Sequence, residues 1–325
     1  MKKIAVLGAS SQIAKDFILS AKAKNEYQLI LFGRNLTYLK DWLSETGLTS
    51  IEVAPYENYG QTDHDVVINF VGVGNPAKAK SMGASILEVT QQYDQLVLKN
   101  LHKYPNRKYL FLSSGAVYGG AFDSPATNQS NATIPINLIT DQDYYSVAKI
   151  YAEVCHRAAA PLAIVDIRVF NYFSQTQDID ARFFITDVVR SIRDGKVLHT
   201  LPQDMNRDFI HPQDFYNLVD CIIKSPKMNT AVDCYSVRPT SKYEILKEMS
   251  EKLGLLYSVT RDQTVSVNAT GTKLNYYSNY HKAAEFGYKP QHSSLDTILN
   301  ESAAILGVQL DYAAKSTGQA DETSS

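Results

Sequence analysis

Three side chains of this sequence have the types and the spacing needed for acid–base chemistry on a carbonyl or alcohol oxygen. Tyr145 and Lys149 are four residues apart, and a helix would hold both on one face, with the ammonium near the phenol. A neighbouring cation favours the phenolate, so we expect Lys149 to lower the pKa of Tyr145 from its usual value of about 10. Ser114, which ends an apolar run upstream, could position the reacting oxygen with its hydroxyl. Together these residues predict the active site of an oxidoreductase.

The interval between Tyr145 and Lys149 is not specific by itself, because Tyr104 and Tyr243 are also followed by a lysine four residues later. Pro105 directly follows Tyr104 in a turn, which does not suit the interior of a helix. Tyr243 lies in a plausible helix, but no serine-glycine turn precedes it nearby. Tyr145 alone follows an apolar strand that ends in serines, and the alternative for it is an ordinary tyrosine–lysine pair on a helix surface.

The composition is that of a globular protein without a strong bias toward a charged partner. Of 325 residues, 44% are hydrophobic and 20% are charged, and the net charge is −2. This length predicts one large α/β domain or a domain with a smaller lobe. The nearly neutral charge argues against nucleic acid and anionic membranes as partners. No run of residues approaches the roughly eighteen apolar residues of a membrane span.

The cysteines and histidines predict neither disulfides nor a metal centre. Three widely spaced cysteines, without a Cys-x-x-Cys pair, suit reduced thiols, and they are Cys155, Cys221 and Cys234. The seven histidines are scattered, with no close pair at metal-ligand spacing. The apolar run near the N-terminus is too short for a signal peptide. We therefore expect a cytoplasmic protein that binds no metal.

Short apolar runs alternate with longer amphipathic stretches through the first half of the chain. This pattern predicts an α/β fold, a doubly wound parallel sheet of the Rossmann type with crossover helices. Strands are expected near residues 3–7, 28–32, 50–53, 66–71, 108–112 and 162–168. Helices are expected near residues 12–24, 35–46, 79–103 and 142–159.

The regular alternation weakens after about residue 170, which predicts a smaller C-terminal lobe with helices near residues 180–194, 211–224 and 241–254. We assign residues 1–170 to a dinucleotide-binding domain and residues 171–314 to a substrate-binding lobe, and the chain is free to cross between them. The polar residues 315–325 have nothing to bury and are expected to be disordered. The long polar connection from Gly119 to Asp141 is either a cover over a substrate or a tolerated surface insertion.

A loop for a dinucleotide diphosphate is predicted directly after the first strand, where a helix begins. Three positions of such a loop are usually glycine, and this sequence keeps glycine only at the first, Gly8. Ser11 occupies the second position, where the backbone must approach phosphate. Ala14 occupies the third, where a small residue lets the helix pack on the strand. The hydroxyl of Ser11 either binds phosphate or loosens the cofactor by its bulk, and a plain strand-to-helix turn is the alternative for the whole loop. The expected cofactor contacts here are Gly8, Ser10, Ser11, Gln12 and Ile13.

The end of the second predicted strand bears on the choice between NAD(H) and NADP(H). An NAD site usually has an acidic residue there for the ribose 2′-hydroxyl, but no carboxylate occurs between Leu29 and Lys40. Arg34 occupies this region, and its guanidinium suits a 2′-phosphate. NADP(H) is therefore favoured as the cofactor, and NAD(H) is the alternative. The alternative for Arg34 itself is a solvated arginine on the surface with no cofactor contact. Gly72, which follows the fourth predicted strand, is expected to lie under the nicotinamide half of the cofactor.

Further runs in the second half follow these motifs in a fixed order: Arg168-Val169-Phe170-Asn171, Arg207-Asp208-Phe209-Ile210-His211 and Phe286-Gly287-Tyr288-Lys289-Pro290. With the loop at Gly8, the run around Ser114 and the pair Tyr145 and Lys149, they give the chain a resemblance over about residues 1–310. It resembles the extended short-chain dehydrogenase/reductase family, in its group of nucleotide-sugar epimerases, dehydratases and ketoreductases. The agreement of several motifs in order is more specific than any one of them.

The resemblance implies a role for each candidate residue. Tyr145 would be the catalytic acid–base, Lys149 would hold the nicotinamide ribose, and Ser114 would bind the reacting oxygen. Asn171 and Arg207 would contact the nucleotide diphosphate of a nucleotide-sugar substrate. The fork of an arginine matches phosphate oxygens, although an ion pair with a neighbouring aspartate is the alternative for Arg207.

Departures from the family pattern narrow the expected reaction. Family dehydratases carry Thr-Asp-Glu beginning at the position that looks like Ser114, and the two acids supply the elimination chemistry. Here Gly115 and Ala116 follow the serine, so a 4,6-dehydratase is not expected. The segment after Asn171 lacks the family's usual Gly-Pro, and Pro212-Gln213 replaces a common Val-Asp, which leaves the sugar and the base open.

The expected function is the NADPH-dependent reduction of a keto group, at C4, of a nucleotide-activated deoxysugar. Arg34 motivates this choice, because a reductive enzyme exchanges its cofactor in each cycle and commonly draws on NADPH. An NAD-dependent nucleotide-sugar 4-epimerase is the close alternative, and a non-catalytic nucleotide-binding scaffold is the alternative of another class. The family often pairs subunits through helices that include the one bearing Tyr145, so the resemblance implies a homodimer.

Overall fold

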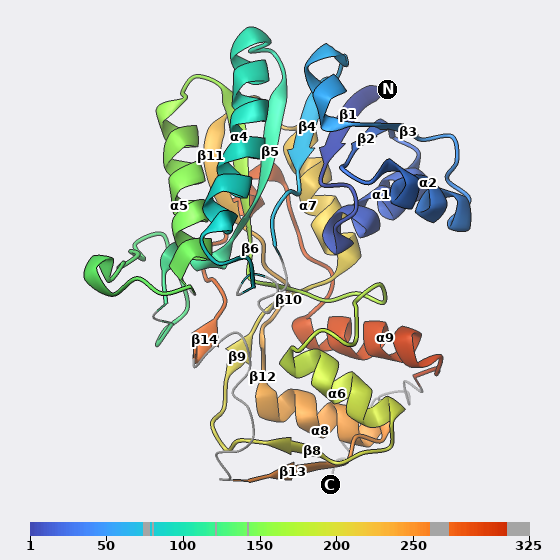
Figure 1. Ribbon diagram of the computed structural model, residues 1–325. Coiled ribbons are helices and arrows are strands. Elements are labelled where there is room, and N and C mark those ends of the chain that lie inside the picture. Colours follow the sequence, from blue (N-terminus) through green and yellow to red (C-terminus); the bar gives the residue numbers. More distant parts are fainter. Residues whose placement is uncertain (74–78, 80, 121, 142, 261–272, 311–325) are drawn as a thin grey trace, which may run out of the picture.

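A seven-stranded parallel sheet forms the centre of the protein, with its strands in the order β11-β6-β5-β4-β1-β2-β3 (Figure 1). The computed structural model describes residues 1–73, 79, 81–120, 122–141, 143–260 and 273–310. The strand order reverses direction between β1 and β4, which confirms the predicted doubly wound, Rossmann-like fold. The strands are β1 (Lys2–Leu7), β2 (Tyr27–Phe32), β3 (Glu52–Ala54), β4 (Val66–Asn69), β5 (Lys108–Ser114), β6 (Ala163–Val169) and β11 (Asn229–Asp233).

Helices cover both faces of this sheet, which explains why its strands are continuous apolar runs rather than alternating ones. In β1, Ile4 and Val6 belong to the core on one face, whereas Ala5 and Leu7 belong to the core on the other. The first face carries α1 (Gln12–Lys24), α2 (Leu36–Glu45) and α7 (Pro212–Lys224), and the second carries α4 (Ser85–Lys103) and α5 (Asp143–Ala158) (Figure 1).

Two elements from the second half of the chain return to the sheet. Helix α7 was expected in the C-terminal lobe, but its residues Phe215, Val219 and Ile222 are buried in the same core as α1 and β1. Strand β11, which was not predicted, extends the sheet by pairing with β6. We keep the division at residue 170 as a proposal in which the chain crosses between the two parts.

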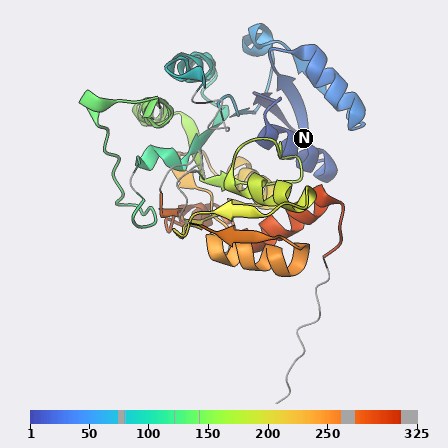
Figure 2. The ribbon, with the colours of Figure 1, turned by 60° about the horizontal axis from the view of Figure 1, so that its bottom comes forward.

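A second core lies beyond the carboxyl ends of the strands. Buried residues of three helices meet there, including Val188, Leu246 and Ile298. The helices are α6 (Phe184–Arg193), α8 (Lys242–Leu253) and α9 (Ser294–Leu306), and they form a separate layer in Figures 1 and 2. Helix α4 begins at Ser85 rather than near residue 79, and residues 74–78 and 80, like the predicted tail at 315–325, lie outside the described residues.

Short strands connect this core with the sheet. In one small sheet β9 lies between β12 and β14, so that Arg207 of β9 is paired with Tyr276 of β14. This pairing brings two distant segments to the carboxyl edge of the main sheet. The short strands are β7 (Asn171–Tyr172), β8 (Leu198–Thr200), β9 (Asn206–Arg207), β10 (Phe209–Ile210), β12 (Thr240–Ser241), β13 (Tyr257–Val259) and β14 (Asn275–Tyr276). Short 3-10 helices are η1 (Tyr56–Gln61), η2 (Gly115–Tyr118), η3 (Ile136–Leu138) and η4 (Lys282–Phe286).

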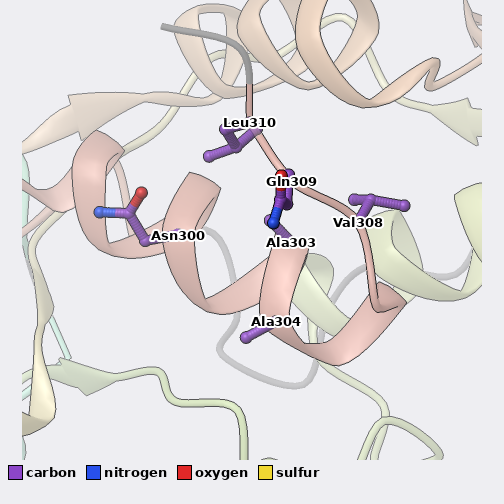
Figure 3. A pocket seen from close by; sticks show the side chains of 6 residues that line it. All are labelled: Asn300, Ala303, Ala304, Val308, Gln309 and Leu310. Atoms are coloured by element: carbon purple, nitrogen blue, oxygen red, sulfur yellow. The ribbon is translucent and has the colours of Figure 1, made fainter.

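The carboxyl end of α9 borders a surface depression of about 390 Å³. Its lining carries no ionisable side chain and none of the candidate site residues, so it offers no acid–base chemistry. The lining residues are Asn300, Ala303, Ala304, Val308, Gln309 and Leu310 (Figure 3).

Among the helices of the described residues, none combines the length and apolarity that crossing a bilayer requires.

Candidate active site

Ser114 and Tyr145 come together at the carboxyl edge of the sheet. Ser114 is the last residue of β5, and Tyr145 lies in the first turn of α5, which packs over β5. Burial raises the pKa of Tyr145, and a side-chain hydrogen bond with Ser114 opposes this effect. The hydroxyl of Ser114 therefore favours the phenolate form of Tyr145, as a partner in proton transfer should.

Lys149 lies one turn further along α5, and only 2% of its surface is exposed. Its ammonium donates a hydrogen bond of 2.8 Å to the carbonyl oxygen of Leu112 and lies 4.3 Å from the ring centre of Phe111. Burial lowers the pKa of Lys149 to about 8, against the attraction of nearby carboxylates, of which Asp94 contributes most. A Cβ atom on Gly72 would lie 3.5 Å from this ammonium, so the structure brings Lys149 beside the predicted nicotinamide floor.

The expected effect of Lys149 on Tyr145 is absent, and this prediction was wrong. The pKa of Tyr145 is raised rather than lowered, because burial is the dominant influence on it. The ammonium lies 5.9 Å from the ring centre of Tyr145, and its hydrogen bond goes to Leu112. Ser114 is the neighbour that lowers the pKa of Tyr145 in this structure.

The turn after β1 depends on Gly8 because of the strand beside it. Gly8 has a φ of +72°, and a Cβ atom there would lie 2.7 Å from the backbone nitrogen of Val71. Its own N–H donates to the hydroxyl of Tyr56 at 3.0 Å. Ala14 is fully buried, which agrees with the need for a small residue where α1 packs on the sheet. The turn therefore presents the N-terminus of α1 at the carboxyl edge, where a diphosphate is favoured.

The side chains of Ser11 and Gln12 have partners within the protein. The hydroxyl of Ser11 caps α1 by accepting a hydrogen bond of 3.4 Å from the N–H of Ala14. The amide of Gln12 donates to the hydroxyl of Ser174 at 2.9 Å and so ties α1 to the segment after β7. Of the other expected contacts, Ser10 is exposed and Ile13 is partly buried, in the same turn. A cofactor contact through the backbone of this turn is compatible with all of these interactions.

Arg34 is exposed directly after β2, in the place expected from the sequence. Burial raises the pKa of Tyr56 to about 12, while its hydrogen bond with Gly8 and the charge of Arg34 act in the opposite direction. Arg34, Tyr56 and Gly8 therefore lie near one another on the β2 side of the site. Sequence reasoning missed Tyr56, which follows β3, because no motif marks it; its ring packs at a tilt against that of Tyr93, with the ring centres 4.5 Å apart.

Arg207 and Asn171 lie on the side of the site toward the C-terminal lobe. Arg207 is only 3% exposed, and its Nη2 atom has no hydrogen-bond partner. Burial lowers its pKa to about 10. The ion pair with an aspartate that was the alternative for Arg207 does not occur within the part of the chain that the structure describes. The amide of Asn171 donates to the carbonyl oxygens of Asp208 and Tyr276, at 3.1 and 3.5 Å.

Tyr276 and Lys273 complete this side of the site, and sequence reasoning missed both. The hydroxyl of Tyr276 lies 3.5 Å from Oγ of Ser114. The ammonium of Lys273 lies 4.4 Å from the ring centre of Tyr276, and burial, followed by the charge of Arg207, lowers the pKa of Lys273 to about 8. Neither residue belongs to a recognisable motif, and the pairing of β14 with β9 helps to bring them to the site.

The sequence from residue 4 to residue 237 matches the NAD dependent epimerase/dehydratase family. The chain belongs to this family. Its nicotinamide-dependent chemistry makes the protein an enzyme of the oxidoreductase type, as Ser114, Tyr145 and Lys149 predicted. Comparison of the sequence with curated proteins gave no match.

Solved structures of nucleotide-sugar enzymes share the fold of this epimerase/dehydratase family member. UDP-glucuronic acid 4-epimerase from Bacillus cereus, in complex with UDP-glucuronic acid and NAD, has a TM-score of 0.75 at 17% identity, over 93% of this chain and 98% of that one. UDP-glucose 4-epimerase from Thermotoga maritima has a TM-score of 0.74 at 16% identity, over 93% and 98%. dTDP-glucose 4,6-dehydratase from Bacillus anthracis, in complex with NAD, has a TM-score of 0.72 at 17% identity, over 94% and 96%. These structures share the fold, and the family match confirms the resemblance inferred from the sequence.

Proposed function

We propose that this family member reduces a keto group, at C4, of a nucleotide-activated deoxysugar with NADPH. The observation that carries the proposal is the meeting of Ser114, Tyr145 and the buried Lys149 where β5 ends. Two hydroxyl groups beside an ammonium can hold a carbonyl oxygen and give it a proton. A non-catalytic scaffold would not need these three side chains together, so the meeting of Ser114, Tyr145 and Lys149 favours an enzyme.

The residues around the turn after β1 fit a nicotinamide dinucleotide. The glycine turn at Gly8 faces the N-terminus of α1 toward the site, and Gly72 and Lys149 adjoin each other further along the same edge. Arg34, exposed at the end of β2, suits the additional phosphate of NADP(H). When bound, the nicotinamide supplies the hydride for such a reduction.

The side chains of the protein then handle the oxygen. Ser114 binds the carbonyl oxygen, and Tyr145 gives it a proton. Because burial raises the pKa of Tyr145, its phenol is protonated at neutral pH, which suits the acid of a reduction. The ammonium of Lys149, held by the carbonyl of Leu112, adds positive charge to the site one helical turn from Tyr145.

Packing at Gly115 supports the exclusion of 4,6-dehydration. A Cβ atom on Gly115 would overlap the ring of Phe170. An acidic side chain at this position therefore requires the aromatic ring to move, and the ring also packs against Tyr276. This packing supports the proposal that Tyr145 protonates the oxygen without a pair of elimination acids.

An anionic substrate is supported by Arg207, whose Nη2 is buried without a partner. A buried charge of this kind is costly unless a ligand completes its hydrogen bonds. Lys273 lies close enough to Arg207 for the two charges to repel, since the charge of Arg207 lowers the pKa of Lys273. A nucleotide diphosphate, with its two negative phosphates, would satisfy both cations.

The second candidate is an NAD-dependent nucleotide-sugar 4-epimerase. It is favoured by the family match and by the structural neighbours in complex with NAD. Denaturing the purified protein and identifying the released dinucleotide separates the two candidates. Bound NAD at close to one per chain, with interconversion of UDP-sugars, supports the epimerase. An initially empty site with NADPH consumption on addition of dTDP-4-keto-6-deoxyglucose supports the reductase.

A homodimer and a cytoplasmic location complete the proposal. The outer face of α5 exposes 48% of Tyr151 and 60% of Val154, and apolar surface of this kind suits contact with a second subunit. The thiols of Cys155, Cys221 and Cys234 are free, which suits a reducing compartment.

A further inference from the structure

The hydroxyl of Ser114 has neighbours on three sides. A serine hydroxyl has one proton to donate and two lone pairs that accept. Its oxygen accepts a hydrogen bond of 3.2 Å from the N–H of Ala116. Tyr276 approaches the same oxygen at 3.5 Å, and Tyr145 interacts with it from α5. Ser114 therefore lies between two tyrosine hydroxyls that come from opposite parts of the molecule.

Packing of its ring against two phenylalanine rings holds Tyr276 in place. The ring packs at 4.8 Å against Phe122 and at 5.2 Å against Phe170, measured between ring centres, and 6% of the residue is exposed. Burial raises the pKa of Tyr276 well above its ordinary value and outweighs a hydrogen bond with Ser114 that lowers it, so the hydroxyl of Tyr276 keeps its proton. A buried hydroxyl proton needs an acceptor, and within the described residues Ser114 is the partner that the structure gives it.

The direction of these hydrogen bonds follows from the groups available. If Tyr276 donates to Ser114, then Ala116 and Tyr276 fill both lone pairs of the serine oxygen. The only proton of Ser114 then points to the side of Tyr145 and the reacting oxygen. If Ser114 donated to Tyr276 instead, the proton of the buried Tyr276 would have no acceptor among the described residues, at a cost comparable to a lost hydrogen bond.

We propose that Tyr276 is a positioning residue that directs the hydroxyl of Ser114 toward Tyr145 and the reacting oxygen. A donor on the oxygen of Ser114 polarises its O–H bond, so Ser114 becomes a better donor in turn. The proposal deepens the proposed function and rests on it, because Ser114 and Tyr145 must act on a substrate oxygen for their orientation to affect turnover.

A double-mutant cycle tests whether Tyr276 acts through Ser114. The variants are Tyr276→Phe, Ser114→Ala and the double variant, and Tyr277→Phe is the matched control on the next residue. Phenylalanine keeps the ring that packs against Phe122, and thermal unfolding checks the fold of each variant. The kcat, the KM and the dependence of kcat on pH are measured with dTDP-4-keto-6-deoxyglucose and NADPH, and in parallel with UDP-glucose as an epimerase substrate.

We expect Tyr276→Phe to lower kcat about 3- to 10-fold, the range for one neutral hydrogen bond, with KM changed less than about twofold. The alkaline limb of the pH profile moves to higher pH, because a weaker donor at Ser114 stabilises the phenolate of Tyr145 less. In the Ser114→Ala background, Tyr276→Phe causes no further loss, and Tyr277→Phe has no effect in either background.

Independent losses that multiply in the double variant would overturn the proposal, as would an unshifted pH profile in Tyr276→Phe. Turnover of UDP-glucose alone would reject the proposed reductase, while the same cycle would still decide the role of Tyr276. If the wild-type protein turns over neither substrate, the catalytic roles of Ser114 and Tyr145 and the role of Tyr276 are rejected together.

Discussion

His156 is completely buried between two carboxylates, and its replacement should make the stability of the protein respond differently to pH. Its Nε2 lies 2.7 Å from Asp94 and its Nδ1 lies 2.6 Å from Asp166, whose side chains are 2% and 0% exposed. Burial alone would lower the pKa of His156, but the attraction and hydrogen bonds of Asp166 and Asp94 prevail and raise it to about 10. The folded protein therefore holds a buried imidazolium at neutral pH.

The magnitude of the effect follows from this environment. In His156→Gln the carboxylate of Asp94 loses its cation, whereas Asp166 keeps its ion pair with Arg157 at 2.7 Å; breaking a buried ion pair costs about 3–5 kcal/mol. A pKa that rises from 6.5 to about 10 corresponds to a similar quantity, about 5 kcal/mol at most. Because the folded-state pKa of His156 is raised, this stabilisation is fully present below pH 6.5 and is lost as the pH rises through 10.

Urea unfolding of the wild-type protein and His156→Gln at pH 7, 8.5 and 10 measures this stabilisation. We expect a difference in the free energy of unfolding on the order of 4 kcal/mol at pH 7 that shrinks by about 1.4 kcal/mol per pH unit. His102→Gln is the matched control, because His102 is exposed on α4, and it should change stability by less than about 0.5 kcal/mol. A difference between wild type and His156→Gln that stays constant from pH 7 to 10 would refute the buried imidazolium.

Other predictions concern the turn after β1, the cofactor and the subunit contact. Gly8→Ala should lower the free energy of unfolding by about 2 kcal/mol more than Gly47→Ala, because both glycines have a similar positive φ but only Gly8 has backbone within contact; equal losses in thermal unfolding would contradict this. Arg34→Gln should reduce the preference for NADPH over NADH about tenfold in a fluorescence titration, whereas an unchanged ratio of dissociation constants would remove Arg34 from the cofactor site. Val154→Glu on the exposed face of α5 should convert the dimer to monomer in analytical ultracentrifugation, and Val197→Glu, which lies outside α5, should not; a dimer that persists in Val154→Glu would exclude this face.

The order of the elements in the first half could be predicted because most strands are apolar on both faces and the helices that cover them have one apolar face. Strand β11 escaped prediction because Asn229–Asp233 is short and polar at both ends, as suits a partly buried strand at the edge of the sheet. Helix α7 was predicted as a helix, but its amphipathic pattern does not specify which apolar surface it covers. That choice depends on contacts with α1, which only the folded chain reveals.

In the candidate site, residues that are close in the sequence could be predicted, whereas residues that only folding brings together could not. Ser114, Tyr145 and Lys149 could be found because they lie on a strand and the next long helix, within one stretch of sequence. Tyr276 and Lys273 reach the site through a two-residue pairing of β14 with β9, which no sequence pattern announced. The direction of the pKa shift of Tyr145 was mispredicted because the spacing of residues shows a neighbouring charge but does not show the extent of burial.

Tyr145 is proposed to give the proton to the substrate oxygen, and the turnover of Tyr145→Phe tests this role most directly. With dTDP-4-keto-6-deoxyglucose and NADPH, we predict that kcat falls at least about 100-fold, while the affinity for NADPH changes less than about twofold. Tyr144→Phe, one residue away on α5, should keep its activity. Undiminished turnover in Tyr145→Phe would contradict the assignment of the active site.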